Sequence, residues 1–328
     1  MSGMNEERLV SIVVPAYNVM DYIGKCLESI KNQSYENFEA LVVNDGSTDK
    51  TAEIIECYCK EDKRFVLLSK QNGGLSSARN YGITHSRGEY ITFVDSDDFI
   101  ERHYIKDLYS ALKENGDSQI AMSKIRWVYE NERIDEISSK FQTSVVSADV
   151  AMKYMMVRNE YTHCAYGKLY LSSFWKNFEF PEGRLYEDYL TTYQLFSRAK
   201  NVVLVDRVGY NYLQRSNSIM HLDVSPKVLS IIDVANEVTE WVSKNVPELK
   251  KSSQELQIAN YFKIYHRIKR SQNNDYSVRI KQIEDYVYKN GVSLLTFKDT
   301  PITDRFKILL FFINKTLFLK VYDKKSKG

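Results

Sequence analysis

The sequence predicts an α/β protein, with a mostly parallel sheet flanked by helices and a helical extension at its C-terminal end. Over the first hundred residues, short apolar, β-branched runs alternate with segments of helical periodicity, which is typical of a parallel sheet covered on both faces. Polar or glycine-rich residues follow four of these runs, and after about residue 225 the pattern changes to long, charged helices. The 328 residues suffice for two structural units.

Four strands and three helices are predicted to alternate. The strands are nearly continuous apolar runs, at residues 9–16, 38–44, 65–68 and 90–95. Helical spacing of apolar residues follows the first three strands, at residues 22–30, 52–59 and 75–83. In such sheets the ligand crevice lies outside the carboxyl ends of the strands. Those ends lead into polar or glycine-rich segments, at residues 15–18, 45–49, 70–74 and 95–98. A ligand site is therefore expected at this edge.

The fourth strand runs directly into the acidic segment Asp95-Ser96-Asp97-Asp98. Carboxylates crowded at the end of a buried strand repel one another unless they share a cation. Oxygen ligands favour Mg²⁺ or Mn²⁺, which keep coordination positions for phosphate or water. We therefore expect the segment to hold a diphosphate through a divalent ion; a solvated turn with Asp98 as a helix cap is the alternative.

Composition excludes several other classes. Lys plus Arg number 45 against 43 Asp plus Glu, so no global charge favours binding to nucleic acid. The four cysteines lack zinc-ligand spacing, and we interpret them as reduced thiols of a cytoplasmic protein. The first eight residues lack the apolar core of a signal peptide, and no apolar run reaches the length of a membrane span.

Beyond Ser225-Pro226, a good helix start, apolar residues recur on one helical face. Residues 304–328 combine apolar runs with interspersed and trailing lysines. This segment is too short and too charged to span a bilayer. A helix lying at the membrane surface fits the composition, and core packing or the contact surface of a homo-oligomer are alternatives.

Taken together, residues 9–221 resemble the family-two glycosyltransferases, including bacterial capsule and exopolysaccharide enzymes. Seven segments in order carry the resemblance: Ser11-Ile12-Val13-Val14-Pro15-Ala16-Tyr17-Asn18, Val42-Val43-Asn44-Asp45-Gly46-Ser47-Thr48-Asp49, Asn72-Gly73-Gly74 leading to Ala78-Arg79-Asn80-Tyr81-Gly82, Asp95-Ser96-Asp97-Asp98, Gly167-Lys168-Leu169-Tyr170, Glu187-Asp188 and Arg215-Ser216-Asn217-Ser218-Ile219. The resemblance implies the GT-A fold, with a nucleotide-sugar-binding catalytic domain over residues 8–223 and a helical region over residues 224–328.

The resemblance also implies a donor site. Its nucleotide-binding residues would be Pro15, Ala16, Tyr17, Asn18, Asp45, Asn72, Arg79, Asp95 and Ser96. Around the base, Asp45 would accept a hydrogen bond from a uracil imide, and Asn72 and Arg79 would donate to the nucleotide. Two structural alternatives stay open: Asp45 as the cap of the following helix, and Arg79 in an ion pair.

For the metal and the chemistry, the resemblance implies that Asp97 ligates Mn²⁺ or Mg²⁺ directly, with Asp95 and His221 as further ligands. Asp188 would deprotonate the acceptor hydroxyl, which implies inversion at the anomeric carbon, and Glu187 would bind the donor sugar or orient the base. The alternative for this pair is charge at a helix N-terminus.

The remaining implied residues meet the two substrates. Arg215 and Ser218 would bind the diphosphate. Lys168 would lie on the acceptor side, either in contact with the substrate or in a surface or packing role.

The expected function is metal-dependent, inverting transfer from a UDP-hexose or UDP-N-acetylhexosamine to a saccharide or lipid-linked glycan in surface polysaccharide synthesis. A dehydrogenase would need a G-x-G-x-x-G turn after the first strand, and a sugar-nucleotide pyrophosphorylase a glycine-rich, basic loop there; neither is present. The acidic cluster ends the fourth strand, not the first as in aspartyl-phosphate hydrolases. A non-catalytic sugar-binding or scaffolding subunit with the same fold is the remaining alternative. The donor sugar, acceptor and linkage stay open.

Overall fold

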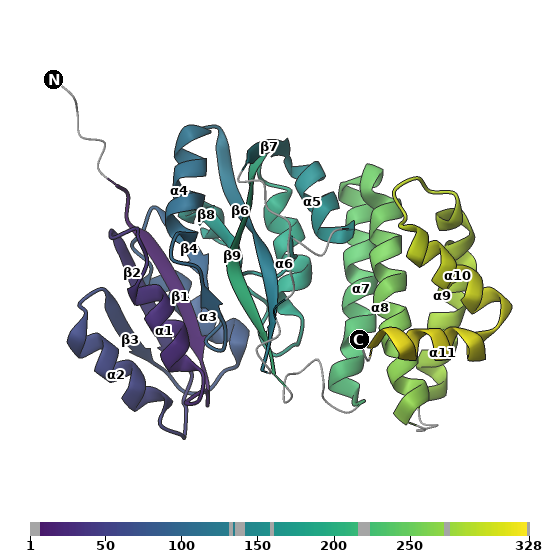
Figure 1. Ribbon diagram of the computed structural model, residues 1–328, viewed down its shortest axis with the longest axis horizontal. Coiled ribbons are helices and arrows are strands. Elements are labelled where there is room, and N and C mark those ends of the chain that lie inside the picture. Colours follow the sequence, from purple (N-terminus) through teal and green to yellow (C-terminus); the bar gives the residue numbers. More distant parts are fainter. Residues whose placement is uncertain are drawn as a thin grey trace. The chain divides into compact units, whose positions relative to one another are not determined.

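The structure is a computed structural model that describes residues 7–130, 134, 142–157, 161–215, 224–271 and 276–326. The chain forms two compact units, Met1–Ser216 and Asn217–Gly328. The first unit holds the strands and the second is helical (Figure 1).

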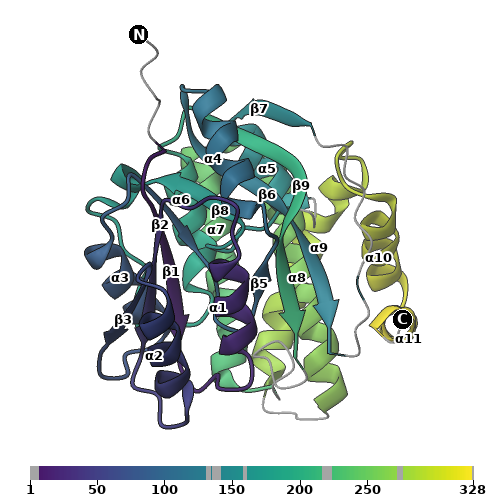
Figure 2. The ribbon, with the colours of Figure 1, turned by 60° about the vertical axis from the view of Figure 1, so that its left-hand side comes forward.

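The first four strands of the N-terminal unit form a parallel sheet in the order β3-β2-β1-β4. They are β1 (Val10–Ala16), β2 (Phe38–Asn44), β3 (Phe65–Ser69) and β4 (Tyr90–Phe93). Every residue of β1 and β2 is buried, as expected for strands covered on both faces. Their carboxyl ends point to one edge of the sheet (Figure 2).

Beyond β4 the sheet becomes mixed. The strand β8 (Lys168–Leu171) pairs antiparallel with β4, and β6 (Ser118–Tyr129) pairs antiparallel with β8. The long strand β9 (Asn201–Gln214) runs parallel to β6, and the short strands β5 (Phe99–Ile100) and β7 (Thr143–Ser147) pair antiparallel with β9. The predicted α/β class is therefore confirmed, with an antiparallel extension that the sequence patterns did not indicate.

Helices cover both faces of this sheet. They are α1 (Ile23–Lys31), α2 (Thr51–Glu61), α3 (Leu75–His85), α4 (Tyr104–Glu114), α5 (Ala148–Val157) and α6 (Glu187–Phe196). Side chains of β1 alternate between faces: Ile12 and Val14 join a core with the apolar face of α1, while Val13 meets Gly82 of α3. A Cβ added at Gly82 would lie 2.4 Å from Val13 Cγ1, so α3 packs closely against the sheet.

The C-terminal unit contains α7 (Pro226–Asn245), α8 (Lys250–Ser271), α9 (Ser277–Leu295), α10 (Ile302–Ile313) and α11 (Lys315–Ser326). The predicted start of α7 is present: Ser225 Oγ accepts a hydrogen bond from the Val228 amide at 3.3 Å, and Pro226 occupies the first turn. Within the described residues, none of the helices combines the length and apolar character needed to cross a bilayer.

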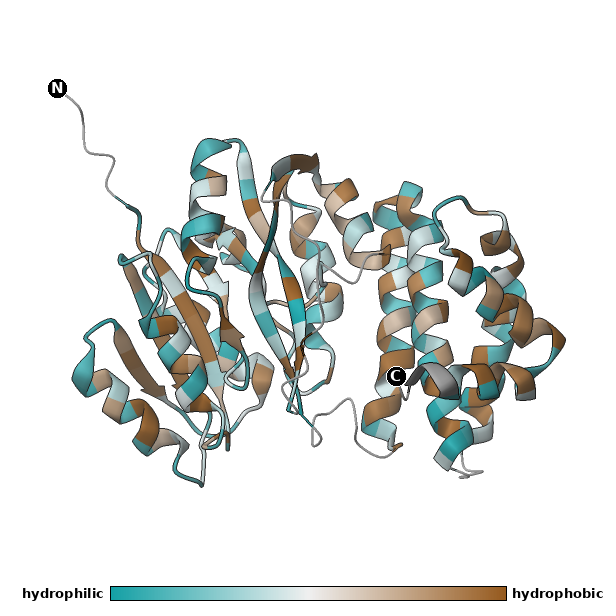
Figure 3. Cartoon of the chain, in the orientation of Figure 1, coloured by the Kyte–Doolittle hydropathy of each residue, from teal (hydrophilic) through white to brown (hydrophobic). Residues whose placement is uncertain are grey.

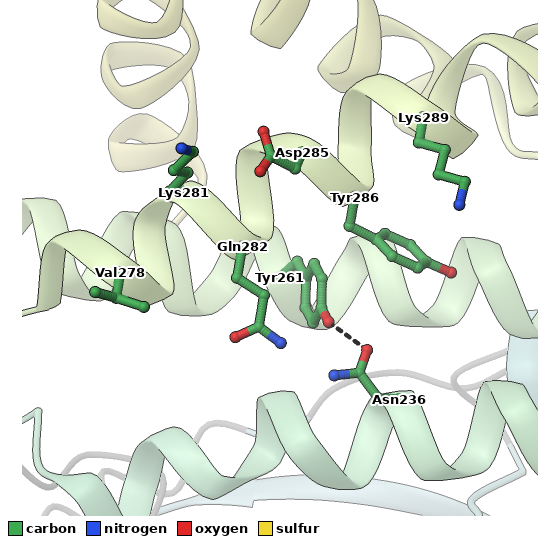
Figure 4. A pocket seen from close by; sticks show the side chains of 8 residues that line it. All are labelled: Asn236, Tyr261, Val278, Lys281, Gln282, Asp285, Tyr286 and Lys289. Carbon is green, nitrogen blue, oxygen red and sulfur yellow. Dashed lines mark hydrogen bonds between the residues drawn. The ribbon is translucent and has the colours of Figure 1, made fainter.

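A pocket of about 500 Å³ opens between α7, α8 and α9 in this unit, and polar residues make up most of its lining. Figure 4 shows Gln282, Asp285 and Tyr286 of α9 at its wall, with Tyr261 donating to Asn236 Oδ1 at 2.7 Å across its floor. None of the site residues predicted from the sequence lines this pocket. The described residues that were predicted as site residues lie instead in the N-terminal unit.

Candidate active site

Asp45 lies at the end of β2, and its carboxylate is 2 % exposed. Its Oδ2 accepts from the Gly74 amide at 2.7 Å, and its Oδ1 accepts from Lys70 Nζ at 2.8 Å and the Gly73 amide at 3.0 Å. Asn72 Nδ2 donates to the Asp45 backbone carbonyl at 2.9 Å. Asp45 therefore fixes the glycine turn that begins α3 and does not cap α2, whose N-cap is Lys50. To donate the predicted hydrogen bond to the Asp45 carboxylate, a uracil imide would have to take the place of one of these donors.

The segment after β1 is joined to the segment after β2. Asn18 has a positive φ of 50°, and its Oδ1 accepts from the Thr48 amide at 2.8 Å, while its own amide donates to Ser47 Oγ at 3.1 Å. Tyr17 is 49 % exposed, whereas Pro15 and Ala16 are buried within β1. Of these predicted base-flanking residues, Tyr17 and Asn18 present side chains at the surface.

The acidic segment after β4 divides into an inner and an outer part. Asp98 is 1 % exposed, and it accepts from the Tyr210 hydroxyl at 2.7 Å and the Leu213 amide at 2.8 Å. Burial, together with Asp97 and Asp95, raises the pKa of Asp98 well above its ordinary value. Asp98 thus joins this segment to β9, which corrects the alternative of a solvated helix cap. Ser96 is also buried.

Asp97 belongs to the outer part and forms an ion pair with Arg215. Burial and the neighbouring Asp95 raise the pKa of Asp97, and Arg215 opposes this shift. The predicted metal ligand and the predicted diphosphate ligand therefore contact each other directly.

Arg79 connects the acidic segment to α6. Its guanidinium is 1 % exposed and donates to Asp95 Oδ1 at 2.8 Å and Glu187 Oε1 at 2.5 Å. Burial disfavours the charge, but Asp95, Glu187 and Asp188 outweigh it, so the pKa of Arg79 lies above its ordinary value. These ion pairs are those of the structural alternative for Arg79. Its predicted role as a donor to the nucleotide stays a prediction.

Glu187 and Asp188 begin α6, directly after Tyr186 in the left-handed conformation with φ 60°. Burial and the adjacent Asp188 raise the pKa of Glu187 to about 7. Asp188 is partly exposed and its Oδ2 accepts from the Ala165 amide at 3.2 Å. Burial, with a contribution from Asp95, also raises its pKa. A carboxylate with a raised pKa is a stronger base near neutral pH.

Lys168 has no exposed surface. Its ammonium group donates to the backbone carbonyls of Thr162 and Cys164, both at 2.6 Å, and of Tyr166 at 3.2 Å. Burial lowers its pKa to about 7. These bonds fit the packing alternative, in which Lys168 shapes the loop whose Ala165 amide donates to Asp188. The predicted acceptor role of Lys168 stays a prediction.

Two predicted residues, Ser218 and His221, lie outside the described residues. Within the described part of the chain, no group of three or more carboxylate, histidine or cysteine side chains gathers as a metal site. Asp95 and Asp97 nevertheless fit a hard cation such as Mg²⁺, which proteins commonly bind through one or two carboxylates plus substrate phosphates.

The site thus consists of two hydrogen-bonded groups at the predicted edge of the sheet. One group surrounds Asp45, and in the other Arg79 joins Asp95 to Glu187, which precedes Asp188 in the chain. Residues 11–173 match the family model described as Glycosyl transferase family 2. The chain belongs to this family.

Curated relatives of this family-2 glycosyltransferase include two proteins of Streptococcus pneumoniae serotype 4. Glycosyltransferase GlyG is 29 % identical over 311 residues, which cover 87 % of the chain and 99 % of GlyG. Glycosyltransferase GlyA is 32 % identical over 235 residues, which cover 70 % of the chain. In the second comparison the match spans only 34 % of the relative's length.

Among solved structures, S. aureus TarS 1-349 in complex with UDP-GlcNAc matches with a TM-score of 0.63. The match covers 98 % of the chain and 92 % of the TarS chain, at 21 % identity. This likeness shows the fold, and the predicted GT-A fold of the family-2 glycosyltransferase is confirmed.

Proposed function

We propose that the protein is a metal-dependent, inverting glycosyltransferase that moves a sugar from a UDP-hexose or UDP-N-acetylhexosamine to a saccharide or lipid-linked glycan in surface polysaccharide synthesis. The observation that carries the proposal is the buried Arg79, which ties Asp95 of the acidic segment to Glu187, the neighbour of Asp188. The proposed diphosphate site and the residue beside the proposed base would thereby be held in one hydrogen-bonded cluster.

The nucleotide would lie along the carboxyl ends of β1 and β2, beside Tyr17, Asn18 and the turn fixed by Asp45. This is the edge where ligands bind in open α/β sheets. The solved complex of TarS with UDP-GlcNAc supports a UDP-sugar as the donor class.

Asp97 and Asp95 would hold a divalent ion, which would neutralise charge on the departing diphosphate. Arg215 would contribute a guanidinium for the phosphate oxygens. Its contact with Asp97 places that guanidinium beside the acidic segment.

Asp188 is the proposed general base. It would take the proton of the acceptor hydroxyl as the oxygen forms a bond to the anomeric carbon and the bond to the diphosphate breaks. A single displacement of this kind inverts the anomeric configuration. The Ala165 amide orients the carboxylate, and burial supports its basicity.

A UDP-release assay with manganese and a panel of UDP-sugars tests the proposal. We expect release from one donor to fall by roughly 10²-fold or more in Asp188→Asn and in Asp97→Asn. Asp117→Asn is the matched control, because Asp117 is an exposed carboxylate in the same unit, and should leave the rate unchanged.

Each part of the proposal can be contradicted by a separate result. Unchanged release by Asp188→Asn would contradict its role as the base, and unchanged release without manganese would contradict metal dependence. Binding of a UDP-sugar in calorimetry without any release, even with added saccharide acceptors, would favour a non-catalytic sugar-binding subunit.

A further inference from the structure

The helix α10 is apolar on two opposite faces. Its inner face is in the core of the C-terminal unit, where Ile308 is 1 % and Phe311 0 % exposed. Its outer face exposes four large apolar side chains at a helical repeat, and these define the outer stripe: Ile302 82 %, Phe306 54 %, Leu309 43 % and Ile313 79 % exposed. Figure 3 shows the helix as a largely hydrophobic ribbon. A helix with two opposite apolar faces normally has both of them covered.

A groove of about 570 Å³ continues the outer stripe toward α11. Ile302 and Phe306 line it from α10, and Phe318 and Val321 line it from α11. Groove and stripe form one apolar surface, whereas single apolar side chains scattered over a surface need no explanation. This surface therefore indicates an external binding partner.

The charge of the same segment indicates which partner fits. Residues 302–328 contain seven Lys or Arg and only two Asp or Glu, while the whole chain has a formal charge of only +2. Among the described side chains, Lys320 is exposed. Basic, amphipathic helices bind anionic lipid surfaces, where apolar side chains enter the headgroup region and cations meet lipid phosphates. The surplus of positive charge in the segment would oppose the association of two copies of it.

We propose that the outer stripe of α10 and its groove bind the surface of an anionic lipid bilayer. Apolar burial holds the helix parallel to the membrane, and the basic residues of the segment provide the attraction to the headgroups. This inference does not depend on the proposed sugar transfer, because binding to vesicles requires neither donor nor acceptor.

Flotation of the full-length protein with phosphatidylcholine vesicles, with and without phosphatidylglycerol, tests the proposal. We expect binding only when phosphatidylglycerol is present, and weaker binding as salt rises. The double variant Phe306→Ser/Ile313→Ser should reduce binding by roughly tenfold or more.

The matched control is Val145→Ser/Val278→Ser, which removes two apolar side chains that are 47 % and 77 % exposed elsewhere. It should float like the unaltered protein, and circular dichroism should show all variants folded. Absence of flotation by the unaltered protein, or equal flotation by the stripe variant, would overturn the proposal. So would light scattering in which the stripe variant abolishes self-association while flotation persists, because the surface would then join copies of the chain.

Discussion

The two units depart from the usual distribution of side chains in opposite ways. The N-terminal unit buries charge: Arg79 and Asp98 are each 1 % exposed, and Glu187 is 6 % exposed. The C-terminal unit exposes apolar surface, with Ile302 at 82 % and Ile313 at 79 %. Buried charges and large exposed apolar patches are both costly. Each departure lies where we propose that the unit meets a ligand or a lipid surface.

The substitution with the largest expected effect removes the buried cation. Arg79→Gln leaves Glu187 and Asp95 without their counterion, which should destabilise the N-terminal unit by about 3–5 kcal/mol and abolish UDP release. The control is Arg87→Gln, whose guanidinium also pairs with a buried carboxylate, Glu39, but is itself 73 % exposed. The free energy of unfolding of the control, measured by chemical denaturation, should change by about 1 kcal/mol or less. If both variants lost the same free energy of unfolding, burial of the arginine would not determine its contribution to stability.

An intermediate effect concerns pH. Because the pKa of Glu187 is raised to about 7 and that of Asp188 is raised as well, both take up protons as pH falls, and transfer should decline below about pH 7. The same shift makes the folded state bind the proton of Glu187 more tightly than the unfolded chain, so its contribution to stability is lost as pH rises from about 4.5 to about 7.

Glu187→Gln removes one negative charge beside Asp188. The acidic limb of the pH–rate profile should therefore move to lower pH, by up to about one unit. A limb at the same pH in both proteins would show that the Glu187–Asp188 pair does not set it.

The smallest expected effect lies in the C-terminal unit. Phe306→Ser, on the outer stripe of α10, should change the free energy of unfolding by only about 0.5 kcal/mol. Phe311→Ala on the opposite face of the same helix should cost about 3–5 kcal/mol, because Phe311 is fully buried. A comparable loss in Phe306→Ser would mean that the stripe supports the fold of the unit.

The sequence predicted the parallel part of the sheet because its signals are local. The apolar runs of β1 and β2 and the helical spacing of α1 can be recognised within a few turns of chain. The short strand β8, with only four residues, has no such signal and was missed.

The connections within the site could not be predicted in the same way. Arg79 is 108 residues from Glu187, and Asp98 is 112 residues from Tyr210, and no pattern along the chain specifies such pairs. Lys168 was identified only by a motif. Its burial arises from the packing of the loop around its ammonium group.

The ion pair between Asp97 and Arg215 has a thermodynamic consequence for the proposed enzyme. A divalent ion and the guanidinium compete for the same carboxylate, so breaking the pair lowers the apparent affinity for the ion. Once displaced, Arg215 is available to the diphosphate. Ion and nucleotide should then strengthen each other's binding by the same factor, as linkage requires. Charge balance at Asp97 is kept before and after the ligands arrive, with one cation exchanged for another.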